Sequence, residues 1–361
     1  LILLFILPIS NSFGAMVTFV DSFQVSNGEK QTTDRAGLAK NTDREIGGVQ
    51  FSDDGTKMFV RFVRDQDGGA SPDTELYSYI DQYNLSTPFD ASTGTYAVSC
   101  ELNHGQTLSN GNPNHEPFDL NFSSDGMKFY VANRNTGKSN SDKNFVYRFD
   151  LTAPYDISDC SYAQKTENLG NFINGSQAGD RVTPAGGLVT LGHSTNLLQG
   201  VSLSNDGKKM FTLMVYGHVL EYDLSTAFDV TTFSLNLNGG MDLSSDTNNP
   251  QSIEFSEDGT RIFIANHNNH KILQISLNAP FDTSSYTVDG AVAFNTSSLG
   301  GVTQMRTVTF SKNGLIMYIG NDDSGGNNID RVLEYNLVCP FNIIAGTCPA
   351  ITKGDRTGIA I

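Results

Sequence analysis

The chain has 361 residues with 23 basic and 39 acidic side chains, which give a formal net charge of −16 at neutral pH. This balance excludes binding to nucleic acid through its phosphates and docking on anionic lipid, because both need a basic surface. Glycine accounts for 35 residues and charged residues for only 17% of the chain. Abundant glycine, with polarity carried by Ser, Thr and Asn, is typical of a turn-rich all-β protein.

The first 15 residues read as the remnant of a secretory signal peptide. Residues 1–8 form an apolar run too short to cross a bilayer, and small polar residues follow it, with cleavage expected after Gly14 or Ala15. A buried N-terminal strand is the alternative. No later segment approaches the roughly 18 apolar residues of a membrane span. We therefore expect a secreted, periplasmic or cell-surface protein whose mature chain has no transmembrane segment.

One motif recurs five times and predicts the fold. Each copy has two segments of alternating apolar and polar residues around an Asp-Gly or Asn-Gly pair, which is the strongest short signal for a β-hairpin. The copies are VQFSDDGTKMFV at 49–60, LNFSSDGMKFYV at 120–131, VSLSNDGKKMFT at 201–212, IEFSEDGTRIFI at 253–264 and VTFSKNGLIMYI at 308–319.

A third strand, a polar turn and an aromatic residue follow each hairpin. The copies are YNLSTPFD at 83–90, FDLTAPYD at 149–156, YDLSTAFD at 222–229, ISLNAPFD at 275–282 and YNLVCPFN at 335–342. We expect the aromatic residue to fill the seam between neighbouring units. The acid or amide after it is expected to accept backbone N–H groups of the turn.

A fourth strand follows in four units only, and this pattern predicts how the fold closes. These strands are expected at 95–102, 161–168, 232–239 and 285–292, whereas the fifth unit has none and a matching segment stands first, at 18–25. The last unit therefore takes its outer strand from the N-terminus, so that no sheet edge stays unpaired. The sequence predicts a five-bladed β-propeller over residues 16–342. Six or seven blades would need a divergent unit between 164 and 198.

The repeats end at residue 342, and residues 343–361 are expected to be a disulfide-pinned tail or a truncated linker. Cys339 and Cys348 flank a short glycine-containing loop and are predicted to pair. Cys100 and Cys160 are the remaining two cysteines. They fall at opposite ends of equivalent strands, so the sequence leaves open whether they pair.

The repeats resemble the YVTN-type and TolB-type β-propellers of secreted and periplasmic bacterial and archaeal proteins. The likeness rests on SIEFSEDGTRIFIANHNNHKILQISL at 252–277 and on VLEYDLSTAFDVTT and TFVDSF, and it covers roughly residues 16–342. It implies the fold and export, but no activity, because propellers serve as scaffolds, binding modules and enzymes. YVTN-type rings more often have seven blades, which is a departure.

The variation in length between units is confined to connections on one face of the ring. The extra residues fall at 61–76, 102–115, 133–144 and 168–198. Loops on one face of a rigid scaffold commonly carry function, so we expect a functional, loop-rich face. Polar residues just before each innermost strand should surround the mouth of the central pocket on that face. They are Arg44, Glu45, His115, Glu116, Asn196, Gln199, Asn249, Gln251, Gln304 and Arg306.

Two groups of acidic residues offer the oxygen ligands that calcium takes. They are Asp65, Asp67 and Asp73 in one loop and Asp322, Asp323 and Asp330 in another. Neither follows the spacing of an EF-hand, and a solvated acidic loop is the alternative. Calcium is the one cofactor for which the sequence offers candidate ligands. The sequence has no nucleophile elbow, phosphate-binding loop or dinucleotide-binding motif.

These observations predict an exported recognition or scaffold module without enzymatic activity. Its loop-rich face and central pocket would bind an extracellular protein, a peptide or a glycan. One alternative is an extracellular hydrolase or lyase acting on glycans, with Glu45 or Glu116 and His115 at the pocket mouth. Another is a structural spacer in a cell-surface protein. The sequence identifies no catalytic residue.

Overall fold

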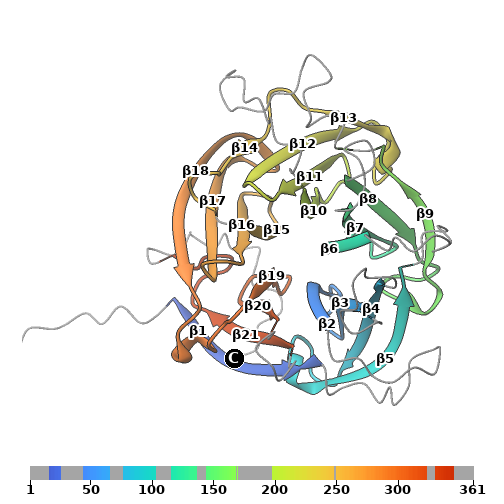
Figure 1. The fold of residues 1–361 in the computed structure, drawn as a ribbon. Helices are drawn as coiled ribbons and strands as arrows, with labels where there is room; N and C mark the ends of the chain where they lie inside the picture. Colours follow the sequence, from blue (N-terminus) through green and yellow to red (C-terminus); the bar gives the residue numbers. More distant parts are fainter. Residues whose placement is uncertain are drawn as a thin grey trace, which may run out of the picture.

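The computed structural model describes residues 16–25, 44–65, 76–102, 115–135, 144–167, 169, 197–247, 249–322 and 330–344. Within these residues the strands form five antiparallel sheets arranged in a ring around one axis (Figure 1). The fold is the five-bladed β-propeller that the repeats predict, and the alternative of six or seven blades is wrong. The described part of the chain contains no helix with the length and hydropathy that a membrane span requires.

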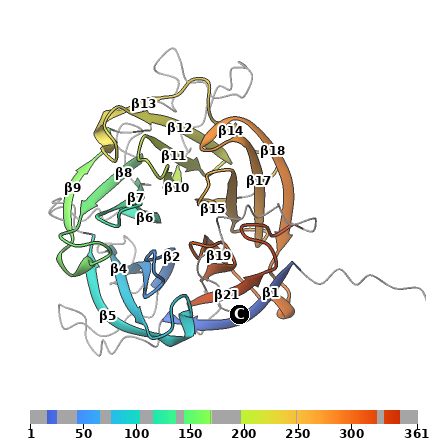
Figure 2. The same cartoon turned by 180° about the vertical axis from the view of Figure 1, so that it is seen from behind.

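In blades 1, 2 and 4 the strands succeed one another outward from the axis in chain order, as the view from behind also shows (Figure 2). Blade 1 consists of β2 (Arg44–Phe51), β3 (Lys57–Asp65), β4 (Leu76–Leu85) and β5 (Gly94–Glu101). Blade 2 consists of β6 (His115–Phe122), β7 (Lys128–Asn135), β8 (Asn144–Asp150) and β9 (Ser161–Lys165). Blade 4 consists of β15 (Pro250–Phe255), β16 (Arg261–Asn266), β17 (Lys271–Ala279) and β18 (Asp282–Ala293).

Blade 3 departs from the prediction at its outer edge. It consists of β10 (Leu198–Leu203), β11 (Lys209–Met214), β12 (His218–Leu224), β13 (Phe233–Leu235) and β14 (Met241–Asp242). The last two strands both pair with β12, so the prediction of a single outer strand at 232–239 is wrong. The side chain of Asn236 accepts the N–H of Asn238 at 3.0 Å, and this turn interrupts the strand.

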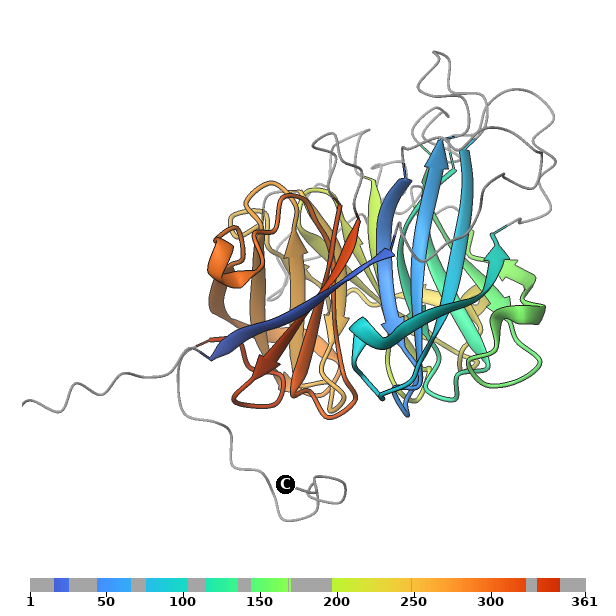
Figure 3. The same cartoon turned by 90° about the horizontal axis from the view of Figure 1, so that it is seen from below.

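The N-terminal strand closes the ring, as predicted. Blade 5 consists of β19 (Met305–Phe310), β20 (Ile316–Asn321), β21 (Arg331–Leu337) and β1 (Val17–Gln24). The pairing of β1 with β21 is antiparallel, and β1 runs along the outside of the last sheet (Figure 3). Because β1 covers the edge of β21, the two ends of the propeller are held in one sheet.

The turns between the third and fourth strands behave as the second motif predicts. Three of these turns contain a short 3₁₀ helix: η2 (Ala91–Thr93), η4 (Ile157–Asp159) and η5 (Val230–Thr232). Another 3₁₀ helix, η6 (Ser297–Leu299), lies in a different connection, after β18. Asp90 accepts the N–H of Ser92 at 3.1 Å. The aromatic residue adopts a positive φ, for example 52° at Phe281. Its ring stacks on Phe211 of blade 3 and Phe255 of blade 4, so it does fill the seam.

A disulfide joins the outer strands of blades 1 and 2. The Cα atoms of Cys100 and Cys160 are 6.1 Å apart across this bond, and it decides the pairing that the sequence left open. Cys339 is also disulfide-bonded. Its expected partner, Cys348, lies outside the described residues, as do the leader at 1–15 and residues 345–361 of the tail. The domain limits predicted from the sequence therefore remain predictions.

Apolar side chains gather between neighbouring blades and leave the axis to other residues. Val146 of β8, for instance, packs in one cluster with Leu198 and Val201 of β10. Side chains alternate along a strand, so the neighbours of such residues on the innermost strands point toward the axis. The fold therefore brings five innermost strands and their turns around a shared central space.

Candidate functional site: an axial pocket at the hairpin face

The hairpins between the first and second strands all turn on one face of the ring, which we call the hairpin face. In each hairpin the serine hydroxyl donates to the acid or amide two residues later, as Ser52 does to Asp54 at 2.7 Å. Asp54 also accepts the N–H of Thr56 at 3.0 Å, and these bonds hold the pKa of its carboxyl below its usual value. The same bond occurs at Ser123, Ser204, Ser256 and Ser311. The residue between the serine and the acid or amide takes no part in this bond, so its identity can vary from blade to blade.

The varied residues surround a pocket of about 130 Å³ at the centre of the hairpin face. One set lies at the ends of the innermost strands, and we call it the floor: Gln50, Asn121, Ser202 and Glu254. The other set lies in the turns, and we call it the rim: Asp53, Ser124, Asn205, Glu257 and Lys312. Every rim residue comes from a different blade, and so does every floor residue. The pocket therefore exists only in the closed ring.

Hydrogen bonds fix the floor. The amide of Gln50 in blade 1 donates to Glu254 Oε2 in blade 4 at 3.1 Å. The hydroxyl of Thr309 in blade 5 donates to Glu254 Oε1 at 3.3 Å. Asn121 Oδ1 accepts the N–H of Leu203 in blade 3 at 3.2 Å. The Glu254 carboxyl is thus held at the axis by side chains from two other blades.

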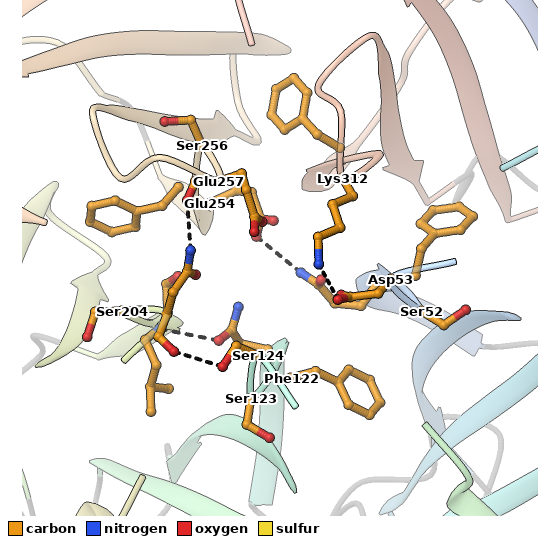
Figure 4. Close-up of a pocket in the computed structure, with 18 of the residues that line it drawn as sticks. Ser52, Asp53, Phe122, Ser123, Ser124, Ser204, Glu254, Ser256, Glu257 and Lys312 are labelled. Atoms are coloured by element: carbon orange, nitrogen blue, oxygen red, sulfur yellow. Dashed lines mark hydrogen bonds and ion pairs between the residues drawn. The ribbon is translucent and has the colours of Figure 1, made fainter. Parts of the chain in front are cut away.

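The rim is linked from blade to blade (Figure 4). Ser124 donates to the carbonyl oxygen of Asn205 at 2.7 Å, and the Asn205 amide donates to the carbonyl oxygen of Glu257 at 2.7 Å. Lys312 forms an ion pair with Asp53. Asp53 also accepts the hydroxyl of Tyr155 at 2.7 Å. These contacts hold the mouth of the pocket in one arrangement, which is the preorganisation that ligand binding favours.

Asp119 of β6 lies beneath the floor. It accepts the N–H of Leu120 at 3.0 Å and the N–H of Ile253 in blade 4 at 3.2 Å. Gly200 of blade 3 makes room for this contact, since a Cβ atom there would lie 3.1 Å from Asp119 Oδ2. Asp119 thus fills the axis below the pocket, and the pocket opens toward the hairpin face.

The carboxyl groups near the axis hold protons more tightly than usual. Burial, reinforced by the neighbouring Asp119, raises the pKa of Glu254 to about 8. Burial raises the pKa of Asp119 to about 7, against the opposing effect of the N–H groups that it accepts. Burial also raises the pKa of Glu257, although Lys312 opposes this. At neutral pH the floor of the pocket therefore carries little negative charge.

The residues predicted to surround the loop-rich mouth are only partly described. Gln199, Gln251 and Arg306 stand at the bulge of an innermost strand, where the pairing with the second strand shifts by one residue. The Gln251 amide donates to Asn249 Oδ1 at 3.0 Å. Arg306 donates to Gln304 at 3.2 Å and forms an ion pair with Asp322 at 2.6 Å. Gln251 and Arg306 thus contact other members of the predicted set, whereas the arrangement of the whole set around one pocket mouth stays a prediction.

The other members of that set lie beyond what the structure describes. Arg44 and Glu45 stand on β2, and His115 and Glu116 on β6, but their side chains are outside the described set, as is Asn196. The long connections that motivated the loop-rich face fall largely outside it as well. Their functional role stays a prediction.

Two of the predicted calcium ligands have described side chains. Asp322 is buried and forms an ion pair with Arg306, and Asp330 is buried directly before β21, whose first residue pairs with Asn321 at the end of β20. The side chain of Asp65 and residues Asp67, Asp73 and Asp323 lie outside the described set. Among the side chains that are described, no three from His, Cys, Asp and Glu gather closely enough to hold a metal ion. Calcium binding stays a prediction.

The sequence analysis did not identify the axial pocket, although the signal is present in the repeats. The hairpin motif keeps its serine, an acid or amide two residues later and its glycine, whereas the second residue before the serine and the residue after the serine differ in every copy. The first of these positions alternates with core residues on the innermost strand, and the second lies in the turn. Repeated residues that build the turn and varied residues that face the axis are therefore the signal of this pocket.

Comparisons with known proteins bear on the fold. No family model matches the chain, and no curated protein matches it. Among solved structures, a luciferin-regenerating enzyme is 12% identical, with a TM-score of 0.44, over 90% of this chain and 96% of that chain. The Cps50 (Swd1) β-propeller domain of Myceliophteria thermophila is 7% identical, with a TM-score of 0.40, over 81% of this chain and 96% of that chain. At these values the likenesses carry no argument about function.

Proposed function

We propose that the chain is an exported recognition module without enzymatic activity, which holds a small polar ligand in the axial pocket. The observation that carries the proposal is the convergence of the varied residues on one cavity of about 130 Å³. The repeated residues of each hairpin form the turn, whereas the varied ones form the floor and the rim. A concave site with a few fixed polar groups is the usual form of a small-molecule site.

Export is supported by the disulfide between Cys100 and Cys160 and by the disulfide-bonded state of Cys339. Disulfides persist in secreted and periplasmic proteins and are rare in the reducing cytosol. The apolar run at residues 1–8 agrees with this location.

The loop-rich face is proposed as the surface for an extracellular protein, peptide or glycan. Its support is Gln199, a residue of the predicted pocket mouth, whose side-chain amide is fully buried and has no hydrogen-bond partner among the residues that the structure describes. A buried amide left in this state costs about 1–3 kcal/mol, which a bound ligand or water would offset. No observation on the described residues favours the hydrolase or lyase alternative or the spacer alternative, so both stay predictions.

The proposal is tested by blocking the pocket. Ser124 is exposed on the rim, and Ser124→Trp should cover the opening without disturbing the core. A panel of monosaccharides, free amino acids, polyols and alkylamines is tested by saturation-transfer NMR on the wild type, on this variant and on Ser234→Trp. Ser234 is exposed on β13, far from the pocket in the outer layer of blade 3. We expect panel members to bind the wild type and the control, and to lose at least tenfold in affinity on the blocked variant.

Two results would overturn the proposal. One is that no member of the panel binds the wild type. The other is that the ligands that bind do so equally well when Trp occupies position 124, because the site would then lie elsewhere.

A further inference from the structure

The axial pocket has more negative than positive groups. Its lining contains three acidic residues and one lysine, and that lysine, Lys312, is paired with Asp53 on the rim. Glu254 and Glu257 belong to the same blade and stand three residues apart on the floor and the rim. Within the described residues neither has an ion-pair partner. Glu254 is half-buried on the floor and Glu257 is exposed on the rim. A desolvated carboxyl group is either protonated or paired with a cation, so a cation that enters the pocket can take the place of the Glu254 proton.

We propose that the axial pocket receives a primary ammonium group, with the carboxylate of Glu254 as its counter-ion. This inference rests on the proposed function, which makes the pocket a ligand site. The ammonium group can come from a free alkylamine or from the side chain of a lysine in a peptide. Both present the same –CH₂–NH₃⁺ end.

The lining fits this chemistry. An ammonium group has three N–H donors and no acceptor. The floor offers the carboxylate oxygens of Glu254, the hydroxyl oxygen of Ser202 and the amide oxygen of Asn121. Phe51, Phe255 and Phe310 also line the pocket and provide apolar surface for the alkyl stem. An anion, by contrast, would lie against Glu254 and Glu257.

Binding is coupled to the release of a proton. Burial and the neighbouring Asp119 raise the pKa of Glu254 to about 8, so its carboxyl is largely protonated below that pH. The other charged groups around the pocket are Glu257, Lys312 and Asp53 on the rim. The arriving ammonium keeps its own three protons, and the carboxyl proton leaves to solvent, so the balance is COOH + RNH₃⁺ giving COO⁻·RNH₃⁺ + H⁺. Affinity should therefore rise with pH up to about 8 and then level off.

The test compares n-butylamine with n-butanol, which has the same alkyl stem and no charge. Binding to the full chain is followed by NMR titration at pH 6, 7 and 8.5, and the protons released are counted by calorimetry in two buffers of different ionisation enthalpy. We expect n-butylamine to bind at least tenfold more tightly than n-butanol at pH 8.5. We also expect its affinity to rise at least tenfold between pH 6 and 8.5, with nearly one proton released at pH 6.

Variants of single residues show which group causes the pH-dependent affinity for n-butylamine. Glu254→Gln should weaken the binding of n-butylamine at least tenfold, abolish the proton release and leave the affinity for n-butanol unchanged. Lys312→Gln removes the rim cation and should tighten the binding of n-butylamine several-fold. This variant provides a second test if the Glu254 variant does not fold. Glu167→Gln, an exposed carboxyl after β9, should behave as the wild type. N-acetyl-lysine methylamide in the same titration shows whether a lysine side chain can enter.

The outcomes separate this inference from the proposed function. If n-butylamine binds no better than n-butanol, or binds independently of pH and of Glu254, the ammonium proposal is overturned. The recognition role would still stand when other members of the panel bind and Ser124→Trp blocks them. If nothing in the panel binds, both proposals fail together.

Discussion

Asp119 is the residue that most clearly departs from its repeat. The equivalent position, directly before the first core residue of each hairpin motif, is a small or uncharged residue in the other blades: Gly48, Gly200, Ser252 and Thr307. Asp119 alone is long enough and charged enough to bridge from blade 2 to the backbone of Ile253 in blade 4. One substitution in a repeated strand thus connects two blades that are not neighbours.

The buried Asp119 predicts that stability falls as the pH rises from about 4 to 7. Burial raises its pKa in the folded protein to about 7, whereas the ordinary value is 3.8. The folded state therefore retains a proton that the unfolded chain releases in this range, and the stabilisation is lost as the pH passes the folded pKa. Glu254, with a pKa of about 8, acts in the same direction. Asp119→Asn should reduce the difference in unfolding free energy between pH 5 and pH 8 by roughly 1–3 kcal/mol.

Urea denaturation at the two pH values measures this difference. Asp159→Asn, at an exposed position in η4, is the matched control and should keep the wild-type dependence. An Asp119 variant with the full wild-type pH dependence would assign the titration to other groups.

At the scale of elements, the disulfide is the covalent link between two blades that otherwise meet through side chains. It joins β5 to the residue that precedes β9, across a sequence separation of 60. Among the described residues, the hydrogen bonds that join strand backbone to strand backbone stay within one sheet. The bond therefore restricts the unfolded chain without being required to form either sheet.

The double variant Cys100→Ser, Cys160→Ser should fold and lose about 4 kcal/mol of stability, from the chain entropy of a loop of this length. Chemical denaturation followed by circular dichroism measures the loss, and the folded spectrum should be unchanged. Equal denaturation midpoints for the variant and the oxidised wild type would show that contacts between the blades already supply this restriction.

At the scale of the whole molecule, stability depends on closing the ring. β1 pairs with β21 over its length, and Phe19 meets the ring of Tyr335 edge-on with centroids 5.6 Å apart. The N–H of Val25 bonds to the carbonyl oxygen of Asp330 at 2.9 Å. The first described residues thus complete the last blade. Phe23 of β1 also meets the ring of Tyr83 in blade 1 with centroids 5.2 Å apart, which holds the last blade against the first.

A chain that begins after residue 25 should lose this closure. The exposed edge of β21 would favour association between chains, and the thermal midpoint should fall by about 5–15 °C. Calorimetry and size-exclusion chromatography measure both effects, and a synthetic peptide of residues 16–25 should reverse them. A monomeric truncated chain with the wild-type midpoint would contradict the role assigned to β1.

The amino-acid sequence alone predicts the architecture. Its Asp-Gly hairpins, its alternating strands and the early segment at 18–25 are local signals, and each acts on a few neighbouring residues, so five copies could be counted and the closing strand identified. It also predicted the role of the turn residues such as Asp90 and Phe281. It did not predict the interruption after Leu235, where the side chain of Asn236 competes with the sheet for the backbone.

The position of the pocket and the groups that meet in it follow from the closed ring and not from local sequence. Gln50 and Glu254 are more than 200 residues apart and come within hydrogen-bond distance because the closed ring directs both toward one axis. The pairing of Cys100 with Cys160 likewise depends on the position of blade 1 beside blade 2. A repeat pattern fixes the contacts within a blade, whereas contacts across the axis depend on the number of blades, their tilt and the bulges of the innermost strands.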